Sequence, residues 1–168
     1  MDSKLTLRQA VLFGMLGSLT FAAKVAMAGL PNIEPVSLFV MLYAVVFGRK
    51  CVYPIYTYVV MEFLCYGFHL WSVNYLYIWI ILAFGAWLLR DIKNPVVWAL
   101  LSGGFGLLFG LLCTPVYAIS GGIGYAVSWW ISGAPFDLVH AGGNFIMALV
   151  LFVPLRNLLT KLYHRIVQ

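Results

Sequence analysis

Charged residues divide this chain into six apolar stretches, and that spacing limits the possible folds more than any other feature of the sequence. Most of the stretches have the roughly 20 residues that an α-helix needs to cross the hydrocarbon core of a bilayer. Only 9% of the 168 residues are charged, against roughly a quarter in a soluble domain. The sequence therefore predicts an all-α membrane protein, one integral membrane domain over residues 1–168 built as a bundle of six transmembrane helices. The predicted helices are Arg8–Leu30, Val36–Phe47, Val52–Phe68, Asn74–Leu89, Val96–Ile119 and Pro135–Leu159.

The basic residues predict how this bundle is oriented in the membrane. Cytoplasmic connections of membrane proteins carry an excess of Lys and Arg. With the N- and C-termini both cytoplasmic, Lys24 alone among the ten basic residues lies toward the outer end, and omitting the short stretch Val36–Phe47 would break this agreement. We therefore expect a multi-pass protein of the cytoplasmic membrane, surrounded by membrane lipid. The nine residues on the cytoplasmic side are Lys4, Arg8, Arg49, Lys50, Arg90, Lys93, Arg156, Lys161 and Arg165.

Several function classes have no support in the sequence. A nucleic-acid-binding protein clusters its basic residues on one face, whereas here they stand singly or in pairs, so we expect no nucleic-acid partner. The chain has no phosphate-binding glycine loop, no zinc motif and no G-x-S-x-G nucleophile, and its three cysteines show no C-x-x-C spacing. We expect no enzyme activity, no cofactor and no bound metal. Energy for any transport would have to come from a partner or from an ion gradient.

Polar side chains toward the outer end are the strongest functional signal. Asp137, His140 and Asn144 share one helix face, and Glu62 lies inside an apolar stretch, where it needs a partner such as Lys24. Ionisable groups at membrane depth usually face a cavity, which favours substrate binding. The structural alternatives are that Asp137 caps its helix, that His140 and Asn144 bond to neighbouring helices, and that Lys24 and Glu62 form an ion pair between helices.

Aromatic residues are concentrated at the same level of the chain. An interfacial belt of Trp and Tyr would explain many of them, but the excess at the outer end favours stacking on a flat ring of a ligand. The complete set of predicted substrate-binding residues is Asn32, Glu34, Glu62, His69, Trp71, Asn74, Tyr75, Trp129, Asp137, His140 and Asn144.

Small residues recur at every fourth position of the first predicted helix, at Gly14, Ser18, Ala22 and Ala26. Such a ridge lets another helix approach closely. It either packs inside the bundle or forms a docking surface for another membrane subunit. A second glycine-rich stretch, residues 120–134, is expected to be a long outer connection and a candidate lid.

Four segments resemble one family of membrane proteins. They are LPNIEPVSLFVMLYAVVFGRK at 30–50, YPIYTYV at 53–59, NYLYIWIIL at 74–82 and SGAPFDLVHAGGNF at 132–145. Together with the six predicted helices, they are similar to the substrate-binding S components of energy-coupling factor (ECF) vitamin transporters. The resemblance is closest to small S components of Gram-positive bacteria, including those assigned to cobalamin.

The resemblance implies a subunit that captures a vitamin-like small molecule from outside the cell and then docks on an ECF module of one transmembrane coupling protein and two ATPases. It places docking on the small-residue ridge and the ligand among the outer loops and later helices. Cobalamin is the first substrate that it suggests, followed by a corrinoid precursor, a pyrimidine and pantothenate. The alternative function is a self-sufficient proton-coupled carrier that uses Glu62 or Asp137 as its coupling carboxylate.

Overall fold

The computed structural model describes residues 5–167, which are almost entirely helical and contain no strand. Four helical stretches within this range are long and apolar enough to cross a membrane: Leu7–Ala26, Val36–Tyr66, Leu70–Leu88 and Pro95–Ile166. The predicted all-α class is confirmed, and the apolar helices are compatible with a membrane-embedded protein. In chain order the elements are α1 (Leu7–Ala26), α2 (Val36–Phe47), the 3-10 helix η1 (Gly48–Cys51), α3 (Val52–Tyr66), α4 (Leu70–Asn74), α5 (Ile78–Leu88) and α6 (Pro95–Val167).

The first three helices begin within one residue of the predicted starts, but α1 ends at Ala26 rather than Leu30 and α3 at Tyr66 rather than Phe68. α2 begins and ends at the predicted residues, and η1 carries Arg49 and Lys50 in the connection that follows. The predicted helix 74–89 overlaps α4 only at Asn74; a turn follows at residues 75–77, and α5 covers the rest of the predicted helix to Leu88. The predicted connection over 120–134 is wrong, because this stretch is helical and belongs to α6.

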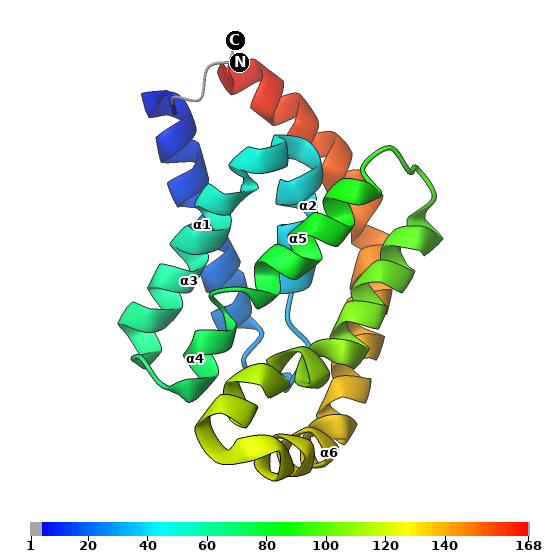
Figure 1. Cartoon of the computed structure of the whole chain (residues 1–168). Helices are drawn as coiled ribbons and strands as arrows, with labels where there is room; N and C mark the ends of the chain where they lie inside the picture. Colours follow the sequence, from blue (N-terminus) through cyan, green and yellow to red (C-terminus); the bar gives the residue numbers. More distant parts are fainter. Residues whose placement is uncertain (1–4, 168) are drawn as a thin grey trace.

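α6 changes direction within its length, so three parts are distinguished here: a descending arm (95–118), a crossing segment (119–134) and an ascending arm (135–167). Figure 1 shows the descending arm turning at the bottom of the view and the ascending arm rising to the C-terminal end. Gly122 has φ 83° and ψ 171°, a backbone conformation that a helix cannot contain and that glycine adopts readily. The two arms then meet again, with Trp98 stacked on Phe152 at 4.1 Å between ring centroids.

Glycines on the descending arm let the ascending arm come close. A Cβ at Gly106 would overlap the backbone of His140 and Ala141, and one at Gly110 would overlap the Asp137 carboxylate. Small residues at helix interfaces allow this kind of approach in membrane proteins. These glycines therefore position Asp137 and His140 against the descending arm.

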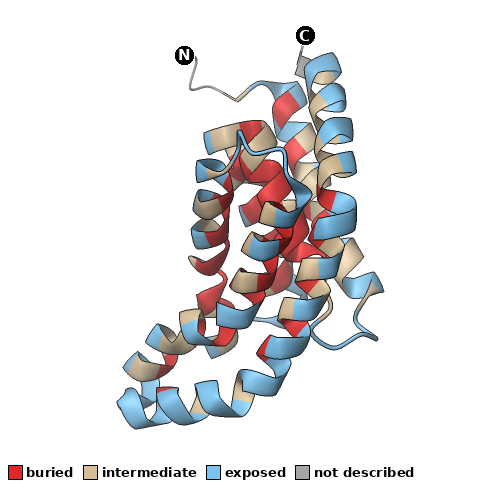
Figure 2. Cartoon of the chain, turned by 90° about the vertical axis from the view of Figure 1, so that its right-hand side faces the viewer, coloured by how far each residue is buried: buried red, intermediate tan, exposed pale blue. Residues whose placement is uncertain are grey.

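α2 is the central helix of the bundle. Nine of its twelve residues are buried, as expected for a helix that is apolar on every side, and Figure 2 shows the buried residues concentrated in the middle of the molecule. α1 packs against α3 where Gly17 meets Pro54 and Thr57 so closely that a Cβ would overlap both. The Thr20 hydroxyl also lies 2.8 Å from that of Tyr43 on α2. α1 is therefore fixed by one face, and its opposite face is left uncovered.

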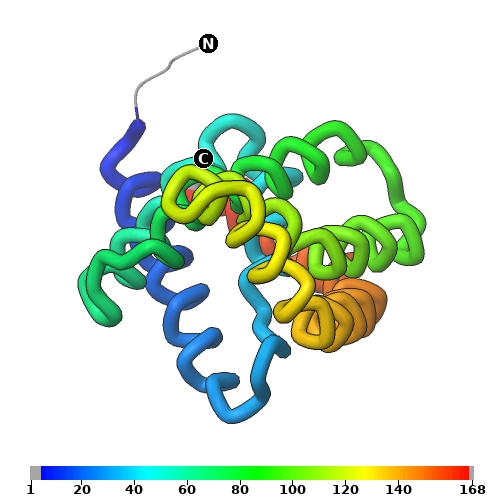
Figure 3. The backbone as a smooth tube through the Cα atoms, turned by 60° about the horizontal axis from the view of Figure 1, so that its bottom comes forward, coloured from blue at the N-terminus to red at the C-terminus, as the bar shows by residue number. Residues whose placement is uncertain are grey.

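The connections gather at two ends of the bundle. At the lower end of Figure 1 lie the connection between α1 and α2, the helix α4 and the crossing segment, whereas η1, the α5–α6 connection and both ends of the described chain lie at the upper end. Figure 3 brings the lower end forward, and the crossing segment lies in front of the helices there. Most of the predicted substrate-binding residues come from the segments that meet at this lower end.

Candidate functional site

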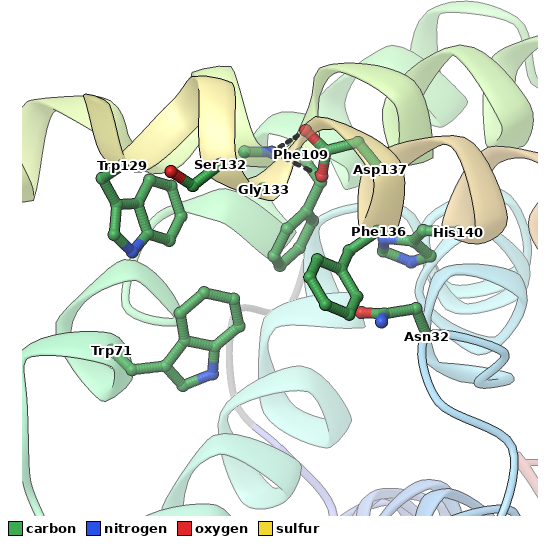
Figure 4. Close-up of a pocket in the computed structure, with 10 residues that line it drawn as sticks. Asn32, Trp71, Phe109, Trp129, Ser132, Gly133, Phe136, Asp137 and His140 are labelled. Carbon is green, nitrogen blue, oxygen red and sulfur yellow. Dashed lines mark hydrogen bonds between the residues drawn. The ribbon is translucent and has the colours of Figure 1, made fainter. Parts of the chain in front are cut away.

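A cavity of about 320 Å³ opens at the lower end of the bundle. We call it the aromatic cavity. Asn32 reaches it from the α1–α2 connection and Trp71 from α4, and α6 supplies the remaining walls (Figure 4). Five predicted residues therefore meet here although they are far apart in sequence. The lining residues are Asn32, Trp71, Phe109, Gly110, Trp129, Ser132, Gly133, Phe136, Asp137 and His140.

The walls of the aromatic cavity are flat rings. The centroids of Trp71 and Trp129 lie 6.1 Å apart with an interplanar angle of 48°, and Phe109 lies 5.8 Å from Trp71. Tyr117 stacks on Trp129 at 3.9 Å and 17°, which holds that indole in place. Rings arranged this way offer broad apolar surface to a planar ligand, whose ring would gain stacking in addition to burial.

Two polar side chains on the ascending arm face this cavity. Both carboxylate oxygens of Asp137 accept the Gly110 N–H at 3.2 Å. His140 is only 4% exposed, and its Nε2 has no hydrogen-bond partner within the described chain. A buried polar atom without a partner is costly. A ligand atom in the cavity would supply the missing hydrogen bond to His140.

The structure overturns one interpretation of Asp137. α6 continues without a new start at Pro135, so Asp137 does not cap a helix. Its carboxylate instead bonds across to the backbone of the descending arm. Asp137 thus joins the two arms of α6 at the wall of the aromatic cavity.

A second, smaller cavity of about 210 Å³ adjoins the first, and Trp71 lines both. We call it the Glu62 cavity. The Lys24 ammonium donates to Glu62 Oε2 at 2.8 Å and to the Tyr75 hydroxyl at 3.3 Å. The pairing of Lys24 with Glu62 expected from the sequence is confirmed. The lining residues are Lys24, Glu62, Tyr66, His69, Trp71, Ser72 and Tyr75.

Glu34 is the second carboxylate near Lys24. It lies in the connection between α1 and α2, with its Oε2 4.0 Å from Lys24 Nζ and its side chain 18% exposed. Burial raises the pKa of the Glu34 carboxyl above its ordinary value, while the neighbouring Lys24 ammonium opposes that shift and the Glu62 carboxylate adds to it. The cost of burying this second negative charge is therefore only partly offset by one ammonium.

Three predicted residues line neither cavity: Glu34, Asn74 and Asn144. Asn144 donates to the Ser37 hydroxyl at 3.0 Å and to the Ser102 carbonyl at 3.3 Å, and so ties α2 to both arms of α6. Asn74 donates to the Trp71 carbonyl at 3.2 Å and accepts from the Tyr77 hydroxyl at 3.0 Å. Asn144 thus stabilises the packing of α2 against α6, and Asn74 stabilises the end of α4. Neither amide lines either cavity.

Five lining residues of the aromatic cavity were not among those predicted: Phe109, Gly110, Ser132, Gly133 and Phe136. The sequence held one signal for the first two, because Gly103, Gly106 and Gly110 have a spacing that indicates close helix contact. Ser132 and Gly133 lie in the stretch predicted to be a connection, and nothing in their type distinguishes them from ordinary loop residues.

The small-residue ridge of α1 faces away from the bundle. A Cβ added at Gly14 would meet nothing within 4 Å, and Ala22 and Ala26 are exposed. Gly14, Ser18 and Ala22 line a shallow apolar groove of about 700 Å³ together with Leu12, Met15, Leu16 and Leu19. The small residue of α1 that packs inside the bundle is Gly17, against Pro54 and Thr57. The groove is a separate candidate site on the side of the molecule.

Comparison of the chain with protein-family models, curated proteins and solved structures found no match in any of the three.

Proposed function

We propose that this chain captures a small molecule as the S component of an ECF-type vitamin importer. The observation that carries the proposal is the aromatic cavity, which Trp71, Trp129 and His140 with its unpartnered Nε2 line together at one end of an apolar helical bundle. Small-molecule sites typically combine mostly apolar walls with a few placed polar groups. In this proposal none of these residues is catalytic.

The proposed topology has six crossings with both termini in the cytoplasm. The crossings are α1, α2, α3, α4 with α5, the descending arm and the ascending arm. Arg49 and Lys50 lie in η1, and Arg90 and Lys93 lie by the α5–α6 connection, at the same end as both ends of the described chain (Figure 1). A cytoplasmic position for this end agrees with the positive-inside rule. The two cavities then face the outside of a bacterial cytoplasmic membrane.

The size of the aromatic cavity favours a compact substrate. Its volume of about 320 Å³ is near the lower limit of pockets that hold drug-sized ligands. Among the candidate substrates this supports a pyrimidine or pantothenate before a corrinoid precursor, and all of these before cobalamin. Cobalamin would require the crossing segment to move away from α4.

The exposed groove on α1 is the proposed docking surface for the coupling protein. Its small residues Gly14, Ser18 and Ala22 leave the helix backbone accessible along one side. In lipid, close packing of such surfaces drives helix association because burial of apolar area supplies no net gain there. The energy for uptake would then come from the ATPases bound to the coupling protein.

A substitution in the groove tests this proposal. Gly14→Trp is expected to reduce co-purification with a bacterial ECF module at least tenfold, because the indole fills the space that the partner helix needs. Gly142→Trp is the matched control, since Gly142 is exposed on α6 and a Cβ there also meets nothing within 4 Å. This control should retain the module.

Two results would count against the proposal. If Gly14→Trp and the unaltered chain retain the module equally, the groove on α1 is not the docking surface. Uptake that follows a pH gradient in liposomes holding this chain alone, without ATP, would favour the self-sufficient carrier.

A further inference from the structure

The ion cluster at the Glu62 cavity contains more acidic than basic charge, because Glu34, which does not itself line the cavity, lies beside the Lys24–Glu62 pair. The carboxylates of Glu62 and Glu34 lie 2.8 and 4.0 Å from the same Lys24 ammonium. Lys24 is the one Lys or Arg side chain among the described residues that line this cavity. His69, which also lines it, shares a hydrogen bond with Ser72 at 2.9 Å between Nδ1 and Oγ. With both carboxyl groups ionised, the cluster therefore lacks one positive charge.

One carboxylate oxygen of Glu62 also lacks a hydrogen-bond donor. The Lys24 ammonium occupies Oε2, while Oε1 is buried without a partner within the described chain. Glu62 as a whole is only 6% exposed. A carboxylate at this depth normally accepts several hydrogen bonds. An N–H or O–H donor that reached the unpartnered Oε1 would therefore be favourable.

The tyrosine rings around this cluster also favour a cation. The Lys24 Nζ lies 5.2 Å from the ring centroid of Tyr75, 5.9 Å from that of Tyr66 and 6.0 Å from that of Tyr58. Ring faces attract a positive charge at this range. Tyr66 and Tyr75 also line the Glu62 cavity. Their rings would thus act on a second cation placed there.

We infer that the Glu62 cavity is the subsite for a positively charged nitrogen of the substrate, whose ring occupies the aromatic cavity. The inference rests on the proposed function. Trp71 lines both cavities, so a compact molecule with a planar ring and a short amine arm can lie against that indole and reach Glu62 Oε1. The substrate class is an aminated heterocycle, such as a pyrimidine with an aminomethyl group. A carboxylate such as pantothenate would meet repulsion from Glu34 and Glu62.

A matched series of probes tests this subsite. Phenyl, pyrimidine and benzimidazole rings, each with an aminomethyl, a hydroxymethyl or a carboxylate arm, are titrated into the purified protein by calorimetry. A hydrogen bond to a charged group is worth enough for roughly a tenfold difference in affinity. We expect the aminomethyl compound of the best-bound ring to bind at least about tenfold more tightly than its hydroxymethyl analogue. The carboxylate should bind most weakly.

Two variants and one control test whether the preference for the amine arm comes from Glu62 and Glu34. Glu62→Gln keeps the side-chain size and an acceptor for Lys24, and it should bring the amine preference below about threefold while the hydroxymethyl compound still binds. Glu34→Gln removes a charge farther from Lys24 and should reduce the preference even if Glu62→Gln fails to fold. Asp91→Asn is the control, because that side chain is 91% exposed in the α5–α6 connection. It should leave the preference unchanged.

The outcomes separate this inference from the proposed function. Equal affinity for all three arms would overturn the cation subsite but leave ring capture in place. A full amine preference in a folded Glu62→Gln protein, and in Glu34→Gln, would also overturn it. If no ring compound binds at all, both the subsite and the proposed capture of a small ring compound are wrong.

Discussion

Replacing Lys24 with methionine is expected to lower the free energy of unfolding by about 3–5 kcal/mol. The substitution leaves Glu62, whose side chain is 7% exposed, and the nearby Glu34 without their shared cation. An uncompensated buried carboxylate is among the most destabilising changes that a single substitution can make. Thermal unfolding in detergent measures the loss as a decrease in melting temperature.

Two further variants make this prediction specific. Lys93→Met also removes a lysine, but Lys93 is exposed in the α5–α6 connection and forms no ion pair among the described residues, so its effect should be small. The double variant Lys24→Met with Glu62→Met replaces the pair by apolar side chains and should recover much of the loss. A Lys24→Met protein as stable as the unaltered chain would show that the ion pair adds nothing to the fold.

Removing both indoles of the aromatic cavity is expected to weaken binding of its small molecule at least about 100-fold, and each single Trp→Ala change about 30-fold. Trp71 and Trp129 are tilted neighbours that both line the cavity, and buried aromatic anchors of this kind dominate binding energies. Isothermal titration with the ring compound that binds most tightly to the unaltered chain measures both effects.

The neighbouring Trp130 supplies the matched control. It is 36% exposed and lines neither cavity. Trp130→Ala should leave the affinity within about twofold of the unaltered chain, since it removes a tryptophan without touching the site. Loss of affinity in Trp130→Ala equal to that in Trp129→Ala would point to general disturbance of the crossing segment.

Two features could be predicted from the sequence, because burying a charge or an unpaired backbone polar group is energetically unfavourable. The charge pattern and the flanking Pro and Gly predicted α2 at its observed residues, although its apolar run is shorter than an ordinary membrane crossing. An unpaired carboxylate in an apolar stretch is energetically costly, so Glu62 was predicted to have a partner. Lys24 is that partner. Both inferences depend on local chemistry that is readable without knowing how helices pack.

Other features depend on packing that the sequence does not display. The glycines of residues 120–134 suggested a loop, yet only Gly122 leaves the helical conformation there. The other glycines of this stretch stay within the helix, where the backbone hydrogen bonds outweigh the conformational freedom that favours a loop. Asn144 shares a face with His140, but its depth along the ascending arm places it against Ser37 rather than in the cavity. The spacing of residues along a helix predicts which of them share a face. It does not predict how far along that face a cavity extends.

Native mass spectrometry of the protein released from detergent is the direct test of whether the aromatic cavity holds a small molecule. We expect one bound compound of modest mass on the unaltered chain and on Trp130→Ala, and its loss from the Trp71→Ala, Trp129→Ala double variant. An unaltered chain that carries no small molecule and retains none from a panel of labelled vitamins and vitamin precursors would contradict this expectation.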